Sequence, residues 1–473
     1  MMNQETNQPK WYRKIPSAFV ILFLILCFVS LLTYVIPSGT FQRTLVNGRN
    51  VVVAGSFAFL DKTPKMTVGV WDLFKAIPVG MIAAAPIMVI VLLAGGMFKI
   101  LERTKAVENA IGIIIRKVGV TKQSKQWMLV VLTFLFALFG AVVGYENVIA
   151  FVPLGIMVAI GMGYDLMVGA AIVIGGVSIG FGTSPINPYT VGVAHSIAEL
   201  PIFSGMGPRG LFGIVCTLIL IHHIGLYMKK IEKHPELSLV KGISTEGLSI
   251  DKEKINEYQL DGRGKVVLAL FVSFVMVIVY GVLKYNWYLT ELSALFVVYG
   301  LLFGVVARFS ADKIADTFMQ GASDIAGGAV IVGFARSISV LLDQGKIGDT
   351  IINSLAAPLV NLPPALSAVA MSLVQGVINF FVPSGSGQAM ATMPIMIPLS
   401  DLIGVNRQIA VQAFQMGDCF LNLIIPTAGG LLAMLALARV PFDKWVQFIL
   451  PVVIKGMCAG WIFLVLATYM NWQ

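Results

Sequence analysis

The feature that most constrains this chain is an internal repeat whose landmarks keep a fixed separation of 241 residues. The landmarks are two charged triplets and two pairs of prolines: Glu102, Lys105 and Glu108 match Asp343, Lys346 and Asp349, Pro153 matches Pro394, and Pro185 matches Pro426. Glycine and proline interrupt the apolar segments at corresponding places in the two halves. In a membrane protein, this pattern is typical of a secondary transporter whose substrate site lies between the halves.

Composition places the chain in a lipid bilayer. Hydrophobic residues make up 57% of the chain and charged residues only 12%, and a soluble fold could not bury so much apolar surface. The net charge is +9, but the basic residues lie in short loops beside apolar runs, where they orient spans. We therefore predict no nucleic-acid partner. The four cysteines lie in apolar segments without metal-ligand spacing, so we predict neither a cofactor nor a metal centre.

The N-terminal segment sets the predicted orientation. Residues 1–14 end in Lys10, Arg13 and Lys14, which predicts a cytoplasmic N-terminus for a multi-pass protein of the inner or plasma membrane. The apolar run that follows, 15–36, is too long for the core of a signal peptide, so we expect it to remain as a span. A polar loop over about 38–68 is expected outside the membrane.

We predict an all-α integral membrane protein, built as an inverted repeat with two re-entrant hairpins and two broken transmembrane helices. The first half, 1–228, holds a scaffold span, a hairpin over 127–161 and a broken helix over 165–200. A hydrophilic cytoplasmic linker follows over 229–265. The second half, 266–473, holds a hairpin over 363–402 and a broken helix over 406–438, and one of its spans is expected over 317–342.

The interruptions are the expected binding site. Non-helical backbone is tolerated at membrane depth only where protein buries it or where it lines a wet cavity, so four interruptions have reason to meet. Free N–H groups at half-helix N-termini suit carboxylates, and freed carbonyls suit cations. The candidate substrate-binding residues are Glu146, Asn147, Ser184, Asn187, Ser384, Ser386, Gln388, Asp418, Asn422 and Thr427. Coupling to Na⁺ or H⁺ is left open, and a Na⁺ ion would then lie near Asn147, Ser184, Ser384 and Thr427. The alternative is that these small residues only pack helices closely.

Ionisable residues inside apolar segments are functional candidates by default. Here they are Glu146, Asp418, Arg336 and, after the first break, His195. Each has a structural alternative. Glu146 would cap the arm that follows it, Asp418 would pair with Arg336, and Arg336 would extend outward to the interface. His195 would be either part of a proton relay or a buried histidine with satisfied hydrogen bonds.

Several motifs together resemble one family. They are Asn379-Phe-Phe-Val-Pro-Ser-Gly-Ser-Gly-Gln388, Met393-Pro394, Gln415-Met-Gly-Asp418, Ser184-Pro-Ile-Asn-Pro188 and Glu146. The likeness is to the YfcC/ArcD-type branch of the C4-dicarboxylate anaerobic carrier family. This resemblance implies the architecture of the ion-transporter superfamily, with a transport part that moves against a scaffold in a homodimer. It also implies exchange of basic amino acids, such as arginine for ornithine, while the wider family carries C4-dicarboxylates.

Two transport hypotheses follow. In the first, the chain is an antiporter of basic amino acids that works by alternating access. The substrate carboxylate meets Ser384, Ser386 and the break at Ser184, and its side-chain cation meets Glu146 or Asp418. In the second, the chain is a Na⁺- or H⁺-coupled C4-dicarboxylate carrier, which requires Arg336 to reach the cavity. A channel is a remote third alternative. We predict no enzyme, because the apolar segments hold no paired nucleophile and base.

Overall fold

The computed structural model describes residues 18–46, 49–118, 121–245, 258–285 and 287–473. The basic segment that predicts a cytoplasmic N-terminus, and part of the predicted linker, lie outside these residues. Within them the chain is nearly all helical, and eight helices are long and apolar enough to cross a membrane. These are α2 (Val70–Arg103), α4 (Lys122–Val143), α9 (Met206–Lys233), α10 (Gly262–Tyr285), α11 (Leu289–Val306), α13 (Ala326–Gly345), α15 (Pro364–Phe381) and α19 (Phe442–Tyr469). The predicted fold class, a helical integral membrane protein, is confirmed.

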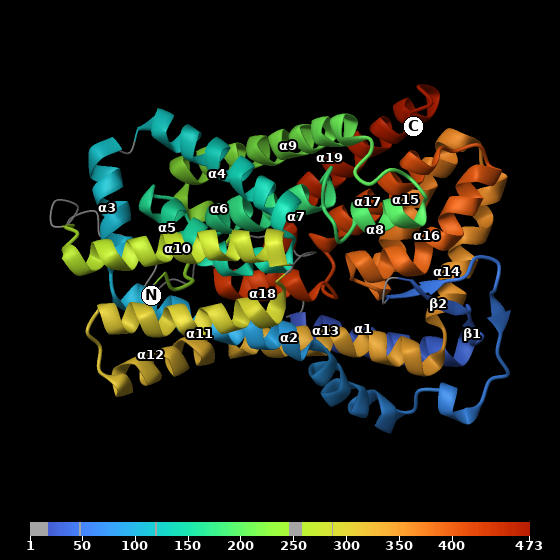
Figure 1. The fold of residues 1–473 in the computed structure, drawn as a ribbon, viewed down its shortest axis with the longest axis horizontal. Helices are drawn as coiled ribbons and strands as arrows, with labels where there is room; N and C mark the ends of the chain where they lie inside the picture. Colours follow the sequence, from blue (N-terminus) through green and yellow to red (C-terminus); the bar gives the residue numbers. More distant parts are fainter. Residues whose placement is uncertain (1–17, 47–48, 119–120, 246–257, 286) are drawn as a thin grey trace, which may run out of the picture.

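One group of helices packs around α2. It contains α1 (Ala18–Val35), α11, α12 (Ala311–Asp324) and α13, and these helices run side by side along the lower part of Figure 1. The single span expected over 317–342 is two helices, because Ile325 leaves the helical conformation with φ −113° and ψ 3°. The polar sequence of α12 does not show where one helix ends and the next begins. We call this group the scaffold.

The loop expected over 38–68 contains short strands. Strand β1 (Gly39–Thr40) pairs with β4 (Ala58–Phe59), and β2 (Arg43–Val46) pairs with β3 (Arg49–Val52), both antiparallel. A short 3₁₀ helix follows at Pro64–Met66. Phe41 and Val52 are buried against Ile352 and Ile378, so the strands cover part of the second half. Composition had indicated only a polar segment, because pairs of two to four residues are too short to leave a periodic signal.

The first half continues as a helical hairpin and a broken helix. Its elements are α3 (Ala106–Val118), α4, the 3₁₀ helix η3 (Glu146–Phe151), α5 (Val152–Gly161), α6 (Leu166–Ala170), the π-helical turn η4 (Ala171–Gly175), α7 (Gly176–Gly182) and α8 (Val191–Ile197). Helix α4 ends at Gly144, whose φ of +100° is a backbone conformation that favours glycine. Helix α7 ends where Pro185 and Pro188 prevent continuation.

A second helical hairpin and a second broken helix follow the 3₁₀ helix η5 (Pro235–Leu237) and helices α10 to α13. The elements of this part are α14 (Gly348–Ala356), η6 (Ala357–Asn361), α15, α16 (Gly385–Leu402), α17 (Arg407–Asn422) and α18 (Gly429–Ala438). The broken helix is interrupted at Leu423–Ala428, around Pro426. In Figure 1, α5 and α6 lie in the left half of the molecule and α15 and α16 in the right half. Two features remain predictions, namely that the hairpins are re-entrant and that the repeat is inverted.

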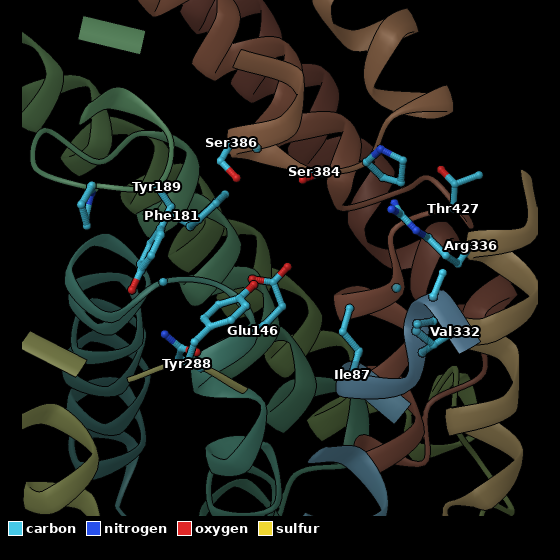
Figure 2. A pocket seen from close by; sticks show the side chains of 18 residues that line it. Ile87, Glu146, Phe181, Tyr189, Tyr288, Val332, Arg336, Ser384, Ser386 and Thr427 are labelled. Atoms are coloured by element: carbon cyan, nitrogen blue, oxygen red, sulfur yellow. The ribbon is translucent and has the colours of Figure 1, made fainter. Parts of the chain in front are cut away.

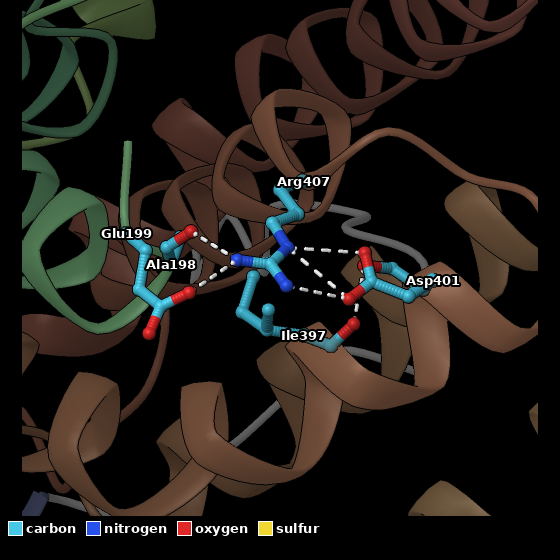
Figure 3. A network of polar contacts seen from close by, with 6 residues as sticks. Ala198, Glu199, Ile397, Asp401 and Arg407 are labelled. Atoms are coloured by element: carbon cyan, nitrogen blue, oxygen red, sulfur yellow. Dashed lines mark hydrogen bonds and ion pairs between the residues drawn. The ribbon is translucent and has the colours of Figure 1, made fainter. Parts of the chain in front are cut away.

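A polar clamp joins three elements at the outer ends of α16 and α17 (Figure 3). The Arg407 guanidinium donates to both carboxylate oxygens of Asp401, with its Nη2 2.8 Å from Asp401 Oδ2. Its Nη1 donates to Glu199 Oε2 at 3.1 Å and to the Ala198 carbonyl at 2.9 Å. The clamp therefore fixes the chain after α8 to the second hairpin, away from the interruptions.

Candidate functional site

The interruptions of the two halves meet inside the molecule. Gln415 of α17 donates from Nε2 to the Ser184 carbonyl at 2.9 Å, and Ser184 Oγ donates to the Ala141 carbonyl near the end of α4 at 2.8 Å. Cys419 Sγ is 3.3 Å from the Ser178 carbonyl of α7. A Cβ atom added at Gly430, the second residue of α18, would lie 2.8 Å from the Tyr145 ring. These contacts hold the turn of the first hairpin and both breaks against one another.

A cavity of about 570 Å³ lies where the interruptions face the scaffold (Figure 2). Both hairpin turns, both breaks and three scaffold helices contribute to its wall. The lining residues are Ala83, Ala84, Ile87, Gly144, Glu146, Asn147, Phe181, Pro188, Tyr189, Tyr288, Val332, Arg336, Pro383, Ser384, Gly385, Ser386, Thr427 and Gly429. Since the wall combines two parts of the molecule, a movement of one part against the other would change the cavity.

The turn of the second hairpin presents a helix N-terminus to the cavity. Ser384 is the N-cap of α16, and its Oγ accepts a hydrogen bond from the Gly387 N–H at 3.3 Å. Ser384, Gly385 and Ser386 all line the cavity. A helix N-terminus carries free N–H groups and the positive end of the helix dipole, so this wall suits an anionic group.

The cavity has one acidic and one basic side chain. Figure 2 shows Glu146 with Tyr288 on one side of the pocket, and Arg336 with Val332 and Thr427 on the other. Glu146 begins η3 and is half-buried, while Arg336 extends from α13 of the scaffold into the open cavity. Among the described residues, no hydrogen bond or ion pair links Arg336 to another side chain, so its guanidinium is available to a ligand.

Five of the predicted binding residues line this cavity. They are Glu146, Asn147, Ser384, Ser386 and Thr427. Arg336, for which outward extension was the alternative, lines it as well, and no ion pair joins Arg336 to Asp418 within the described part of the chain. The site therefore includes a scaffold residue in addition to the hairpin turns and the second break.

The other five predicted residues lie behind the cavity wall. Ser184 is buried and bonded to α4, as described above. Asn187 Oδ1 accepts from the N–H groups of Tyr189 and Thr190, which shapes the first break. Gln388 Nε2 donates to Gln375 at 2.7 Å. Asn422 joins Asn379 of α15 to Asp418. For these five residues, a role in binding substrate directly remains a prediction.

Some lining residues were not identified from the sequence. Tyr288, at the N-cap of α11, and the small or aliphatic residues of α2 belong to the scaffold, where no interruption marks them. Tyr288 lies near Tyr189, with ring centroids 6.1 Å apart, so two aromatic rings border the acidic side of the cavity. The one sequence feature that could have identified Tyr288 as a lining residue was its position in a short turn between two apolar runs.

His195 is buried away from the cavity in a satisfied network. Its Nδ1 accepts from the Phe203 N–H at 3.0 Å, and its Nε2 lies 2.9 Å from Arg209 Nη1 and 3.2 Å from Gln408 Oε1. Both ring nitrogens thus have polar neighbours, and His195 does not line the cavity. Either role for His195 stays a prediction. In the part of the chain that the structure describes, no group of three acidic, histidine or cysteine side chains could hold a metal ion.

The chain is similar in sequence to known proteins along nearly its whole length. The sequence model of the family described as "C4-dicarboxylate anaerobic carrier" matches residues 15–469. The chain is 33% identical to the "Putative basic amino acid antiporter YfcC" of Escherichia coli (strain K12), over 91% of this chain and 92% of that one. It is 28% identical to an uncharacterized protein of Haemophilus influenzae, over 95% and 96% of the two chains. Among solved structures, the YdaH transporter of Alcanivorax borkumensis aligns over 97% of this chain and 99% of its own, with 17% identity and a TM-score of 0.43.

Proposed function

The chain belongs to the C4-dicarboxylate anaerobic carrier family, and from that premise we propose that this membrane transporter is an antiporter of basic amino acids. The observation that carries the proposal is the pair of opposite charges on the two sides of the cavity, Glu146 and Arg336. A relative named as an antiporter of basic amino acids, which aligns along nearly the whole chain, supports the same substrate class.

The cavity has a matching group for two of the three charges of such a substrate, its α-carboxylate and its side-chain cation. Arg336, with the donors of the turn at Ser384 and Ser386, would bind the α-carboxylate, since a guanidinium binds a carboxylate through two parallel hydrogen bonds. Glu146 would bind the cationic side chain. A charge removed from water requires an opposite partner, and this arrangement supplies one at each end of the substrate.

The middle of the substrate would lie against apolar and aromatic surface. Phe181, Tyr189 and Tyr288 border the cavity near Glu146, and Ile87 and Val332 line it near Arg336. The aliphatic stem of arginine or ornithine would pack against these groups and gain free energy from burial, at about 0.8 kcal/mol for each methylene. Binding would then require both the charges and the length of the substrate to match the cavity.

Exchange between the two sides of the membrane would follow because two separate parts of the molecule form the cavity wall. One part of it belongs to the hairpins and broken helices, and the other to the scaffold helices α2, α11 and α13. If the first part moves against the scaffold, as the family architecture implies, the same binding groups would open alternately to each side. A bound substrate would stabilise the closed intermediate, which favours exchange over net flow.

Counterflow in proteoliposomes tests the proposal. Vesicles are preloaded with unlabelled arginine, ornithine or succinate, and entry of the labelled compound is followed with and without a Na⁺ gradient. We expect accumulation with internal arginine or ornithine and none with succinate. Vesicles without protein and vesicles with Arg336→Gln protein serve as controls.

Two observations favour a second candidate, a Na⁺- or H⁺-coupled C4-dicarboxylate carrier. The family description names that substrate class, and Arg336 reaches the cavity, as this alternative requires. In that case Glu146 would serve the coupling ion and not the substrate. Accumulation that requires internal succinate and an inward Na⁺ gradient would favour this candidate and reject the exchange of basic amino acids.

A further inference from the structure

Asp418 is a buried carboxylate without a compensating charge. It lies on α17 with its side chain 0% exposed. Asn422 Nδ2 donates to Asp418 Oδ1 at 3.2 Å, but Oδ2 has no hydrogen-bond partner among the described residues. In the same part of the chain, no lysine, arginine or histidine lies within ion-pair distance of it. An ionised, unpaired carboxylate in a protein interior costs several kcal/mol.

No basic group near Asp418 offsets this cost. The ionisable groups that face it are Glu146, Tyr145 and Cys419, and none of them is basic. Helices α7 and α15, which pack against α17, carry no ionisable residue.

The remaining charged groups on elements packed against α17 point elsewhere. His195 of α8 contacts Gln408, about 15 Å from Asp418 along the helix at 1.5 Å per residue. Asp401 of α16 is held by Arg407. On α19, Lys455 and Cys458 are exposed, and the others lie towards its two ends: Asp443, Lys444 and Tyr469.

Asp418 is separated from the cavity by the backbone of Gly385. A Cβ atom at Gly385, which lines the cavity, would lie 3.4 Å from Asp418 Oδ2 and 2.6 Å from the Thr190 methyl group. The ring of Phe181 lies equally near, at 3.4 Å. The free oxygen of Asp418 therefore lies close to the turn of the second hairpin, whose residue Gly385 lines the cavity.

We propose that Asp418 is a proton-binding site, and that a cationic substrate in the neighbouring cavity expels its proton. In the empty cavity, the charges of Glu146 and Arg336 cancel, so a proton on Oδ2 keeps the region neutral. A basic amino acid adds one positive charge. Breaking the O–H bond at Oδ2 then leaves the electron pair on the carboxylate, releases the proton to cavity water and restores neutrality.

A proton fits this position better than a metal cation. It needs only the one free oxygen, whereas a sodium ion needs several oxygen ligands, and among the three side chains nearest to Gly385 the only other oxygen is the hydroxyl of Thr190. By linkage, substrate and proton weaken each other's binding by the same factor. The coupling to substrate rests on the proposed function, but the proton itself does not.

Infrared difference spectroscopy of the full-length protein in lipid tests the proton site without any substrate. We expect the band of a protonated carboxyl group to persist at neutral pH in the natural protein and in Glu146→Gln, to be lost in Asp418→Asn, and to shift in Asp418→Glu. Asn keeps the shape of Asp, so folding should be retained. The proposal is overturned if the band survives Asp418→Asn, disappears in Glu146→Gln, or disappears when NaCl replaces choline chloride at constant pH. If Asp418→Asn does not fold, the replacement of choline chloride by NaCl and the Glu146→Gln variant still test the proposal.

Proton release on binding L-arginine tests the coupling. A pH indicator in weakly buffered detergent solution should report up to about one proton released for each arginine bound, and none in Asp418→Asn. Arginine binding without proton release would reject the coupling. If L-arginine does not bind at all, the proposed function fails, while the infrared result still decides whether Asp418 carries a proton.

Discussion

The two hairpin turns border the same cavity but present opposite chemistry to it. The first turn, at Gly144, leads into a short 3₁₀ helix and contributes the carboxylate of Glu146. The second turn leads directly into α16 and contributes a capped helix N-terminus with Ser384 and Ser386. A repeat that was identical in chemistry would favour a symmetric ligand, whereas these two turns favour a ligand with unlike ends.

The difference arises from how each second arm begins. After the first turn, six residues of 3₁₀ helix precede α5, so no long α-helix directs its N-terminus at the cavity. After the second turn, Ser384 caps an uninterrupted helix of 18 residues. The first turn thus contributes the acidic side chain, and the second turn contributes the positive end of a helix dipole. Arg336 of the scaffold adds a second positive group to the cavity wall. The following predictions separate these contributions, beginning with the largest.

Glu146→Gln should have the largest effect on exchange. The substitution keeps size and hydrogen bonding but removes the only acidic side chain in the cavity wall among the described residues. Leaving the substrate cation without a partner should cost about 3 kcal/mol, or on the order of 100-fold in the kcat/KM for labelled arginine. Glu236→Gln, in the exposed segment after α9, is the matched control and should be neutral. Equal loss for arginine and for succinate would show that Glu146 serves the mechanism rather than the cation.

Arg336→Gln should weaken recognition of the carboxylate. Hydrogen bonds to a charged group contribute about 2 kcal/mol, so we expect about 30-fold poorer exchange of arginine. Competition separates this role from a structural one. The decarboxylated amine of arginine should inhibit natural and variant protein equally, because it lacks the group that Arg336 binds. Arg308→Gln, at the end of α11 and outside the cavity wall, is the control. A variant that loses inhibition by the amine as well would contradict the assignment.

Gly144→Ala should destabilise the protein by about 1–2 kcal/mol. The residue has φ +100°, and an added Cβ would lie 3.3 Å from the Tyr189 ring, so both backbone strain and crowding oppose the change. We expect a lower Tm in detergent together with reduced exchange. Gly207→Ala, in α9, is a matched control, because nothing lies within 4 Å of its added Cβ and its helix should tolerate alanine. Equal Tm values for the two variants would mean that the first turn is not rigid.

Local sequence signals predicted the helix interruptions but not the packing around them. The breaks near Pro185 and Pro426 could be read because each proline has polar residues and glycines beside it. Proline alone is not sufficient, since α2, α16 and α19 continue through their own prolines. The division of the scaffold span at Ile325 depends instead on how α12 lies against α2, and no residue type marks it. The strands over 39–59 also depend on contacts with the second half.

The same distinction explains which site residues could be predicted. Glu146 and Ser384 belong to the two hairpin turns and line the cavity, whereas Ser184 and Asn187 of the first break do not. Asp418 and Gln388 lie within α17 and α16, so the rotation of each helix decides which side chains reach the cavity, and sequence separation alone does not fix it. Arg336 was ambiguous for the same reason, because a polar residue on a scaffold helix can face lipid, protein or cavity.

Ser384→Ala should have the smallest effect, and it tests whether the second turn acts as a helix cap or as a pair of hydroxyl groups. Loss of an N-cap costs about 1 kcal/mol, which corresponds to about fivefold in the KM for arginine if the cap orients the N–H groups of α16. Ser384→Gly should cost only a few tenths of a kcal/mol, since glycine is tolerated at this position. Ser386→Ala leaves the cap intact and should change KM less than Ser384→Ala. The reverse order would mean that the hydroxyl of Ser386 binds the carboxylate directly, and that the contrast between the two turns comes from side chains and not from the helix dipole.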